Sequence, residues 1–148
     1  MEPKEFAALA SRLSQARGSG PADFRTAISR AYYAAFNVAV HVLKQIGSPA
    51  LDGPGAHKEV ACSLMACKDE ALSIAGSSMD QLRTRRIQAD YRMERSDVEK
   101  KNTAVQVCET AHEVIGELEK LLVDQERRAL VGPQIEAYQR VIRGESKV

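Results

Sequence analysis

The sequence predicts an all-α protein in which several helices pack around one long central helix. Apolar residues recur at steps of three or four along most of the chain, as they do on the buried face of a helix. No stretch alternates apolar and polar residues as a half-buried strand does, and there is no hairpin signal. Residues 24–46 contain neither Gly nor Pro and are apolar on more than one side, so we expect them to form the central helix.

The predicted central helix carries small residues that would let neighbouring helices approach closely. These residues are Ala31, Ala34, Ala35 and Ala39. Pro21 suits the first position of this helix, where a backbone N–H would have no partner in the helix, and Asp23 is favourable in the first turn. Gly47 is placed to end the helix.

Three other helices in the first two thirds of the chain are predicted from the residues that begin or end them. A first helix over residues 5–17 is stopped by the Gly and Pro of residues 18–21. A third helix over residues 56–75 is closed by Gly76. A fourth helix over residues 80–93 has an Asp at its N-cap position.

The last third is predicted to form two further helices. Ser96 and Glu99 fit a capping box, with Ser at the N-cap and Glu at the third helical position, which predicts the start of a fifth helix. Gly132 and Pro133 are expected to break that helix. A short C-terminal helix then runs to Arg143.

Two segments are expected to be irregular. Residues 48–55 contain two prolines and two glycines, which cannot be helical throughout, so we expect fast amide exchange and early proteolytic cleavage there. Residues 144–148 are expected to fray.

Length and composition limit the classes of protein to which the chain can belong. At 148 residues it is predicted to be one domain, residues 1–148. The net charge of +1 means that nucleic-acid binding would need a local basic cluster. An odd count of three cysteines without an export signal indicates a reducing, cytoplasmic environment. No segment approaches the ~20 apolar residues of a membrane span, so no membrane association is expected.

A line of polar residues runs along the predicted central helix. Arg30, Asn37 and His41 are seven and four residues apart and fall on nearly one line, with Tyr33 beside it. This polar seam could bind a phosphate or a nucleotide, with Arg30 as the partner of the anion. Alternatively, Arg30 could pair with a carboxylate of a neighbouring helix such as Asp90, and the seam would be structural.

The fourth helix carries the densest group of arginines, in the segment LRTRRIQADY. Arg86 and Asp90 are four residues apart and can pair, which would leave Arg83 and Arg85 available for an anion. Tyr91 lies one step round the helix, where it can pack and present a hydroxyl. The alternative is a solvated helix face on which these arginines are balanced by nearby acidic residues.

Metal and cofactor sites are not expected. A zinc site could be assembled only from Cys62, Cys67, Cys108 and His112. The first two are five residues apart, a poor spacing for joint ligation from a helix, so small buried apolar residues are the better interpretation of the cysteines. The sequence contains no Gly-rich phosphate loop, no HExxH and no nucleophile elbow.

The central segment ISRAYYAAFNVAVHVL resembles the R-A-Y-Y-A-x-F helix of the HEPN superfamily, small helical domains of prokaryotic toxin–antitoxin and defence loci. A His after the loop, in GAHKEV, and a segment similar to L-R-x-x-R-x-x-A-D-Y follow in the same order as in that family. The resemblance covers residues 24–122. It implies an antiparallel bundle of four to five helices, a homodimer, and a polar cleft between the subunits.

Many HEPN proteins are metal-independent RNases that use an Arg followed four to six residues later by a His. No His of this chain, neither His41, His57 nor His112, has an Arg in that window. The resemblance therefore implies a non-catalytic or weakly catalytic module that binds RNA or a nucleotide at a dimer cleft lined by Arg30, Tyr33, Arg83 and Arg86. It also implies a role in a toxin–antitoxin or antiviral system, beside a nucleotidyltransferase or a toxin or antitoxin partner.

Two other functions remain open from the sequence. One is a metal-independent RNase with a divergent active site, in which an arginine stabilises the phosphorane and His41 or His57 transfers protons. The other is a structural interaction module whose polar seam only fixes the register of a dimer.

Overall fold

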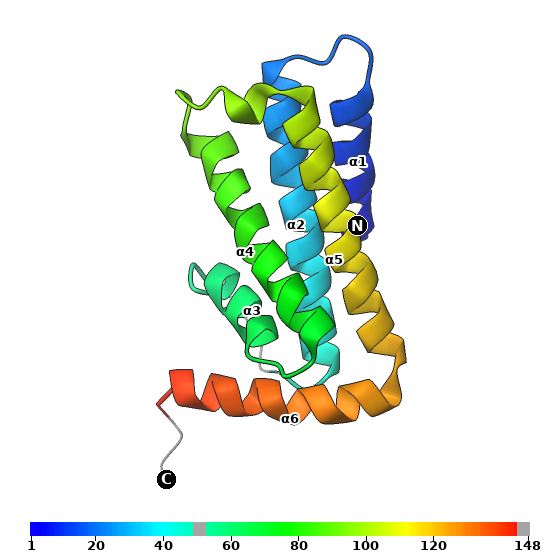
Figure 1. Cartoon of the computed structure of the whole chain (residues 1–148), viewed down its shortest axis with the longest axis vertical. Helices are drawn as coiled ribbons and strands as arrows, with labels where there is room; N and C mark the ends of the chain where they lie inside the picture. The colour runs from blue at the N-terminus through cyan, green and yellow to red at the C-terminus, as the bar shows by residue number, and fades with distance from the viewer. Residues whose placement is uncertain (49–52, 145–148) are drawn as a thin grey trace.

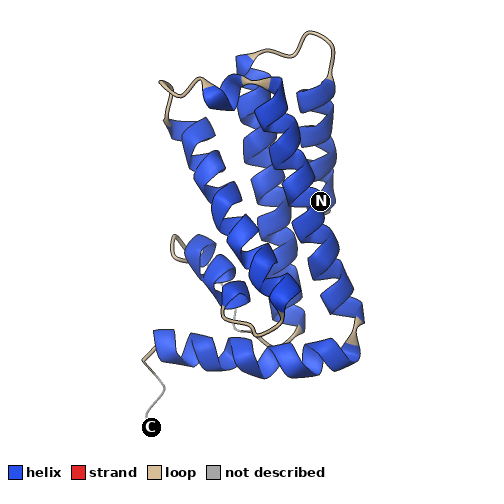
Figure 2. Cartoon of the chain, in the orientation of Figure 1, coloured by secondary structure: helices blue, strands red, loops and turns tan. Residues whose placement is uncertain are grey.

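The computed structural model describes residues 1–48 and 53–144, and in that part of the chain all regular structure is helical (Figure 2). The predicted all-α helical bundle is therefore confirmed. The helices are α1 (Pro3–Gln15), α2 (Pro21–Gln45), α3 (Ala56–Met65), α4 (Glu70–Tyr91), α5 (Lys101–Val123) and α6 (Gln125–Ile142), with a 3-10 turn, η1 (Asp97–Glu99), before α5.

Four long helices run along the length of the molecule and α6 lies across one end of them (Figure 1). In chain order α1 and α4 run in one direction, and α2 and α5 run in the other. The short α3 lies beside the first half of α4. The core is formed around α2, which packs against α1, α4 and α5.

The central helix α2 has the ends that the sequence predicts. Pro21 occupies its first turn, and the Asp23 carboxylate accepts a hydrogen bond of 2.8 Å from the backbone N–H of Gly20. After the helix, Gly47 adopts φ 90°, a conformation in which a Cβ is strongly disfavoured. The alanines of the predicted close-approach set are all buried within the chain (Ala31, Ala34, Ala35 and Ala39).

The boundary between α3 and α4 differs from the prediction. The expected helix 56–75 already ends at Met65, and α4 begins at Glu70 with Asp69 as its N-cap, which accepts from the backbone N–H of Leu72 at 3.1 Å. Gly76 lies inside α4, at the place where α3 comes close to α4. A Cβ on Gly76 would stand 2.7 Å from the backbone nitrogen of Met65, so this glycine permits a close contact and does not stop a helix.

The start of α5 also differs from the prediction. Ser96 makes no capping hydrogen bond through its side chain, residues Asp97–Glu99 form a 3-10 turn, and α5 begins at Lys101. The carboxylate that the capping box requires is used elsewhere. Glu99 accepts a hydrogen bond of 2.9 Å from Nε of Arg25, on α2.

The expected break at Gly132 and Pro133 is wrong. The chain turns earlier, at Asp124, whose carboxylate accepts from the backbone N–H of Arg127 at 3.0 Å and caps α6. Pro133 lies inside α6 and is exposed. The turn at Asp124 lets Val131 and Ile135 bury against the end of the bundle, which outweighs the cost of a proline within a helix.

Parts of two predicted irregular segments, residues 49–52 and 145–148, lie outside the described residues. Within the described part, Gly53 has φ 75° and precedes the first turn of α3. No described helix combines the length and the apolar character that crossing a membrane requires.

Candidate functional site

Six of the predicted site residues, two on α2 and four on α4, lie together on one side of the bundle with the first turn of α3, whereas Asn37 and His41 do not join them. We call this group the arginine–tyrosine cluster. Its members are Arg30, Tyr32, Tyr33, His57, Arg83, Arg86, Asp90 and Tyr91.

Arg86 lies at the centre of the arginine–tyrosine cluster and is 8% exposed. Its guanidinium carbon lies 5.4 Å from the ring centroid of Tyr32, 5.6 Å from that of Tyr33 and 6.0 Å from that of Tyr91. These distances are typical of cation–π contacts. The predicted pair with Asp90 forms only at the limit of an ion pair, with 4.0 Å between Nη1 and Oδ2.

The guanidinium groups of the cluster are incompletely satisfied. Among the described residues, the buried side-chain nitrogen and oxygen atoms that lack a hydrogen-bond partner are Nε of Arg83 and Nε of Arg86. Arg83 is half-buried and forms no ion pair with a described residue. Two positive charges therefore lie close together on α4, and their one ion pair with a described carboxylate is the 4.0 Å contact of Arg86 with Asp90.

A tyrosine and a histidine, both uncharged, lie next to these arginines and contact each other. The Tyr32 hydroxyl lies 2.7 Å from Nδ1 of His57, and the His57 ring stacks on Phe36 with 4.3 Å between centroids. Burial raises the pKa of Tyr32 to about 12, an effect that Arg86 opposes. Partial burial, and then the charges of Arg86 and Arg83, lower the pKa of His57 below 6.5. Both groups are therefore neutral near pH 7.

Arg30 does not pair with Asp90, so the structural alternative for Arg30 is not found in this form. Its guanidinium carbon lies between the rings of Phe6, at 4.9 Å, and Tyr33, at 5.1 Å. Ser29 separates the two charged groups: its hydroxyl donates to Oδ2 of Asp90 at 3.2 Å and accepts from Nη2 of Arg30 at 3.4 Å. The sequence reasoning missed Ser29, although a serine within an apolar helix stripe is itself a sign of a buried polar contact.

The polar seam of α2 does not act as one unit. Asn37 is exposed and its amide donates to the backbone carbonyl of Tyr33 at 2.7 Å. His41 is exposed and lines a hollow with Pro3, Lys4 and Glu119, near the start of α1. Residues 30 and 41 share a line on the helix but are separated by about 16 Å along its axis, since each residue rises about 1.5 Å.

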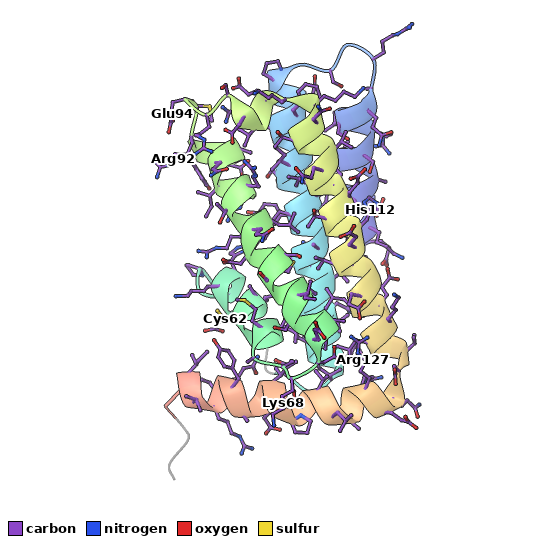
Figure 3. The ribbon with its side chains drawn as sticks, viewed as in Figure 1. Cys62, Lys68, Arg92, Glu94, His112 and Arg127 are labelled. Carbon is purple, nitrogen blue, oxygen red and sulfur yellow. The ribbon has the colours of Figure 1, made fainter. Side chains whose placement is uncertain are left out.

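Arg85 and Arg95 belong to a solvated ion-pair network, which agrees with the structural alternative for these two arginines. Arg85 lies 2.8 Å and Arg95 lies 2.9 Å from the carboxylate of Asp97. The hydrogen bond from Arg95, followed by that from Arg85, holds the pKa of Asp97 well below its usual range. Arg92 is exposed at the end of α4 (Figure 3).

The cysteines and His112 do not come together as ligands. Cys62 lies on α3 and His112 on α5, on different parts of the bundle (Figure 3). Cys67 donates to the carbonyl of Ser63 at 3.5 Å, and His112 Nδ1 lies 2.7 Å from the carbonyl of Cys108. In residues 1–48 and 53–144, no group of three or more His, Cys, Asp or Glu side chains is placed to hold a metal ion.

Comparison with known proteins does not assign this arrangement to a family. No protein-family model matches the chain, and searches of curated proteins and of solved structures give no significant match.

Proposed function

We propose that this chain is a HEPN-type helical module that binds RNA or a nucleotide through the arginine–tyrosine cluster. The observation that carries the proposal is the incomplete satisfaction of Arg86 and Arg83. Arg86 is nine-tenths buried, its nearest carboxylate is at 4.0 Å, and the Nε atoms of both arginines lack a partner among the described residues.

A buried guanidinium costs several kcal/mol unless it is paired and hydrogen-bonded, and cation–π contacts of about 0.5–2 kcal/mol offset only part of that cost. An anion supplied from outside the chain would complete the pairing. Phosphate is the anion that best matches guanidinium geometry, because its oxygens can accept two parallel N–H bonds. With a net charge of +1, the chain attracts such a ligand locally and not through its overall field.

The position of the residues that carry the HEPN resemblance supports the same proposal. Tyr32 and Tyr33 from α2, His57 from the start of α3, and Asp90 and Tyr91 from the end of α4 all belong to the arginine–tyrosine cluster. Segments that are far apart in the chain therefore contribute to one cluster. We propose that the exposed side of this cluster lines a cleft of a cytoplasmic homodimer that functions with a nucleotidyltransferase, or with a toxin or antitoxin partner, in a defence locus.

The proposal is tested by the binding of a short single-stranded RNA at several salt concentrations. Arg83→Ala and Arg86→Ala should each weaken binding and flatten its salt dependence, because fewer counterions are released from the RNA. Arg85→Ala is the matched control: it removes the same charge from the same helix, but Arg85 pairs with Asp97 outside the cluster. Equal effects of all three substitutions would show non-specific attraction and contradict the proposal.

Two other functions give distinct results in the same experiment. A metal-independent RNase is favoured by one observation, the position of His57 beside two arginines; cleavage by the parent protein that His57→Ala abolishes would establish it. His41 lies outside the cluster and serves as the control. If the parent binds no RNA or nucleotide and Arg86→Ala lowers the melting temperature strongly, the cluster is a structural network.

A further inference from the structure

A cleft of about 360 Å³ adjoins the arginine–tyrosine cluster between the first half of α2 and the last turn of α4. Its polar lining includes Thr26, Ser29, Arg30 and Asp90. The Asp90 side chain is 29% exposed, so its carboxylate is reachable from this cleft. The cleft therefore offers a hydrogen-bond acceptor directly beside the proposed phosphate site.

The placement of Asp90 is unfavourable for a site that holds only phosphate. Its negative charge, 4.0 Å from Arg86, repels an anion that approaches the same arginine. It also stands in the last turn of α4, where the helix dipole disfavours a carboxylate. A ligand with a hydroxyl group next to its phosphate removes this conflict, because a hydroxyl donates to a carboxylate.

The hydrogen bonds of Asp90 leave room for such a donor. An ionised carboxylate has about four acceptor positions. Oδ2 accepts from Ser29 at 3.2 Å, and the structure gives Asp90 no other side-chain hydrogen bond among the described residues. Ser29 is 4% exposed and fixed between Asp90 and Arg30, so it acts as a positioning residue that holds the carboxylate toward the cleft.

We infer that Asp90, positioned by Ser29, accepts a hydrogen bond from a ribose 2′-hydroxyl, so that the site prefers ribonucleotides to deoxyribonucleotides. The 2′-hydroxyl is the group by which a protein distinguishes RNA from DNA, and carboxylates accept from it in other nucleotide sites. This inference rests on the proposed function, since the arginines must hold the adjacent phosphate. It adds the class of sugar that the site takes.

The experiment compares a short oligoadenylate made as RNA with the same oligomer made as DNA, using fluorescence anisotropy. The parent protein should bind the RNA roughly tenfold more tightly or more, the range of one hydrogen bond to a charged group. In Asp90→Ala, RNA binding should weaken while DNA binding strengthens, because a repulsive charge is lost. Ser29→Ala should also reduce the ratio of the two affinities, which a general loss of stability would not do.

The control is Glu94→Ala, which removes an exposed carboxylate just beyond the end of α4 (Figure 3). It should strengthen the binding of both oligomers equally and leave their ratio unchanged. Asp90→Asn keeps the shape of the side chain and guards against misfolding of the alanine variant. Equal binding of RNA and DNA by the parent, or an unchanged ratio in Asp90→Ala, overturns the inference but leaves the proposed function intact. Binding of neither oligomer contradicts the RNA binding of the proposed function itself.

Discussion

The hydroxyl of Tyr32 lies 2.7 Å from Nδ1 of His57, and this contact joins the middle of α2 to the first turn of α3. It is made beside Arg86 and Arg83, whose charges add to the effect of partial burial in lowering the pKa of His57. The contact therefore links packing of the bundle to the charge of the arginine–tyrosine cluster.

The stability of the protein should fall on mild acidification because of His57. Its pKa in the folded state lies below 6.5, the value for an unfolded chain, so at pH below about 6.5 the unfolded state binds more protons. The contribution of His57 is fully present above about pH 6.5 and is lost as the pH falls toward the folded pKa. Urea denaturation at several pH values between about pH 7 and pH 5 measures how the free energy of unfolding changes with pH.

His57→Asn should flatten the dependence of the free energy of unfolding on pH, because it removes the imidazole whose pKa is lowered in the folded state. Asp69 also contributes to the pH dependence of stability, but over a separate, more acidic pH range. Its pKa is lowered from 3.8, chiefly by the hydrogen bond from Arg127, so its contribution is lost only at more acidic pH. A slope unchanged in His57→Asn would contradict the assignment to His57.

Arg25 holds the C-terminal end of α4 to α2, and Arg25→Ala should lower the free energy of unfolding by about 2–4 kcal/mol. Its guanidinium donates to the carbonyl of Ala89 at 2.8 Å, to that of Arg95 at 2.9 Å, and to Glu99. The substitution leaves these acceptors without their donor. Chemical denaturation measures the loss, and Arg92→Ala, at an exposed position, should change stability by less than about 0.5 kcal/mol.

Gly76→Ala and Gly116→Ala should have opposite effects, although both glycines lie within helices. A Cβ at Gly76 would stand 2.7 Å from the backbone nitrogen of Met65 and 2.8 Å from the carbonyl oxygen of Ala61, so overpacking should cost about 1–3 kcal/mol. A Cβ at Gly116 meets nothing within 4 Å, so alanine there should stabilise α5 by about 0.5–1 kcal/mol. The melting temperatures of the two variants test this prediction. A lower melting temperature in both variants would contradict the packing argument.

Arg127 fastens α6 to the bundle, and Arg127→Ala should cost about 2–3 kcal/mol. It donates to Asp69, the N-cap residue of α4, at 2.6 Å and 2.9 Å and to Glu117 of α5 at 2.6 Å, and so joins α6 to both elements (Figure 3). Hydrogen exchange should become faster in α6 before it does in α2. Arg140→Ala removes an exposed pair with Glu136 and should cost less than about 0.5 kcal/mol.

Light scattering at micromolar concentration should give the mass of a dimer. The alanines of α2 are buried within the chain, so the expectation now rests on the HEPN resemblance and on the incompletely paired Arg86. A partner subunit would bring further groups to the arginine–tyrosine cluster. A monomer at every concentration would remove the cleft between subunits from the proposed function and leave a site on a single chain.

The helical class and the extent of α2 follow from the sequence alone. Its signals there are local: an apolar period of 3.6 residues, Pro21 at the start and Gly47 at the end. It also placed Arg86 beside Asp90, because residues four apart on a helix are neighbours.

The tertiary structure alone decided the breaks between helices and the partners of the polar groups. Gly76 and Pro133 are helix breakers by propensity, yet the approach of α3 in one case and burial of Val131 and Ile135 in the other keep them inside helices. A pair between Arg30 and Asp90 is one of the two alternatives that the sequence leaves open, and the structure excludes it because the Ser29 hydroxyl lies between them. Contacts between segments distant in the chain outweigh local preferences of about 1 kcal/mol for Gly and about 3 kcal/mol for Pro, and those contacts exist only after the helices have packed.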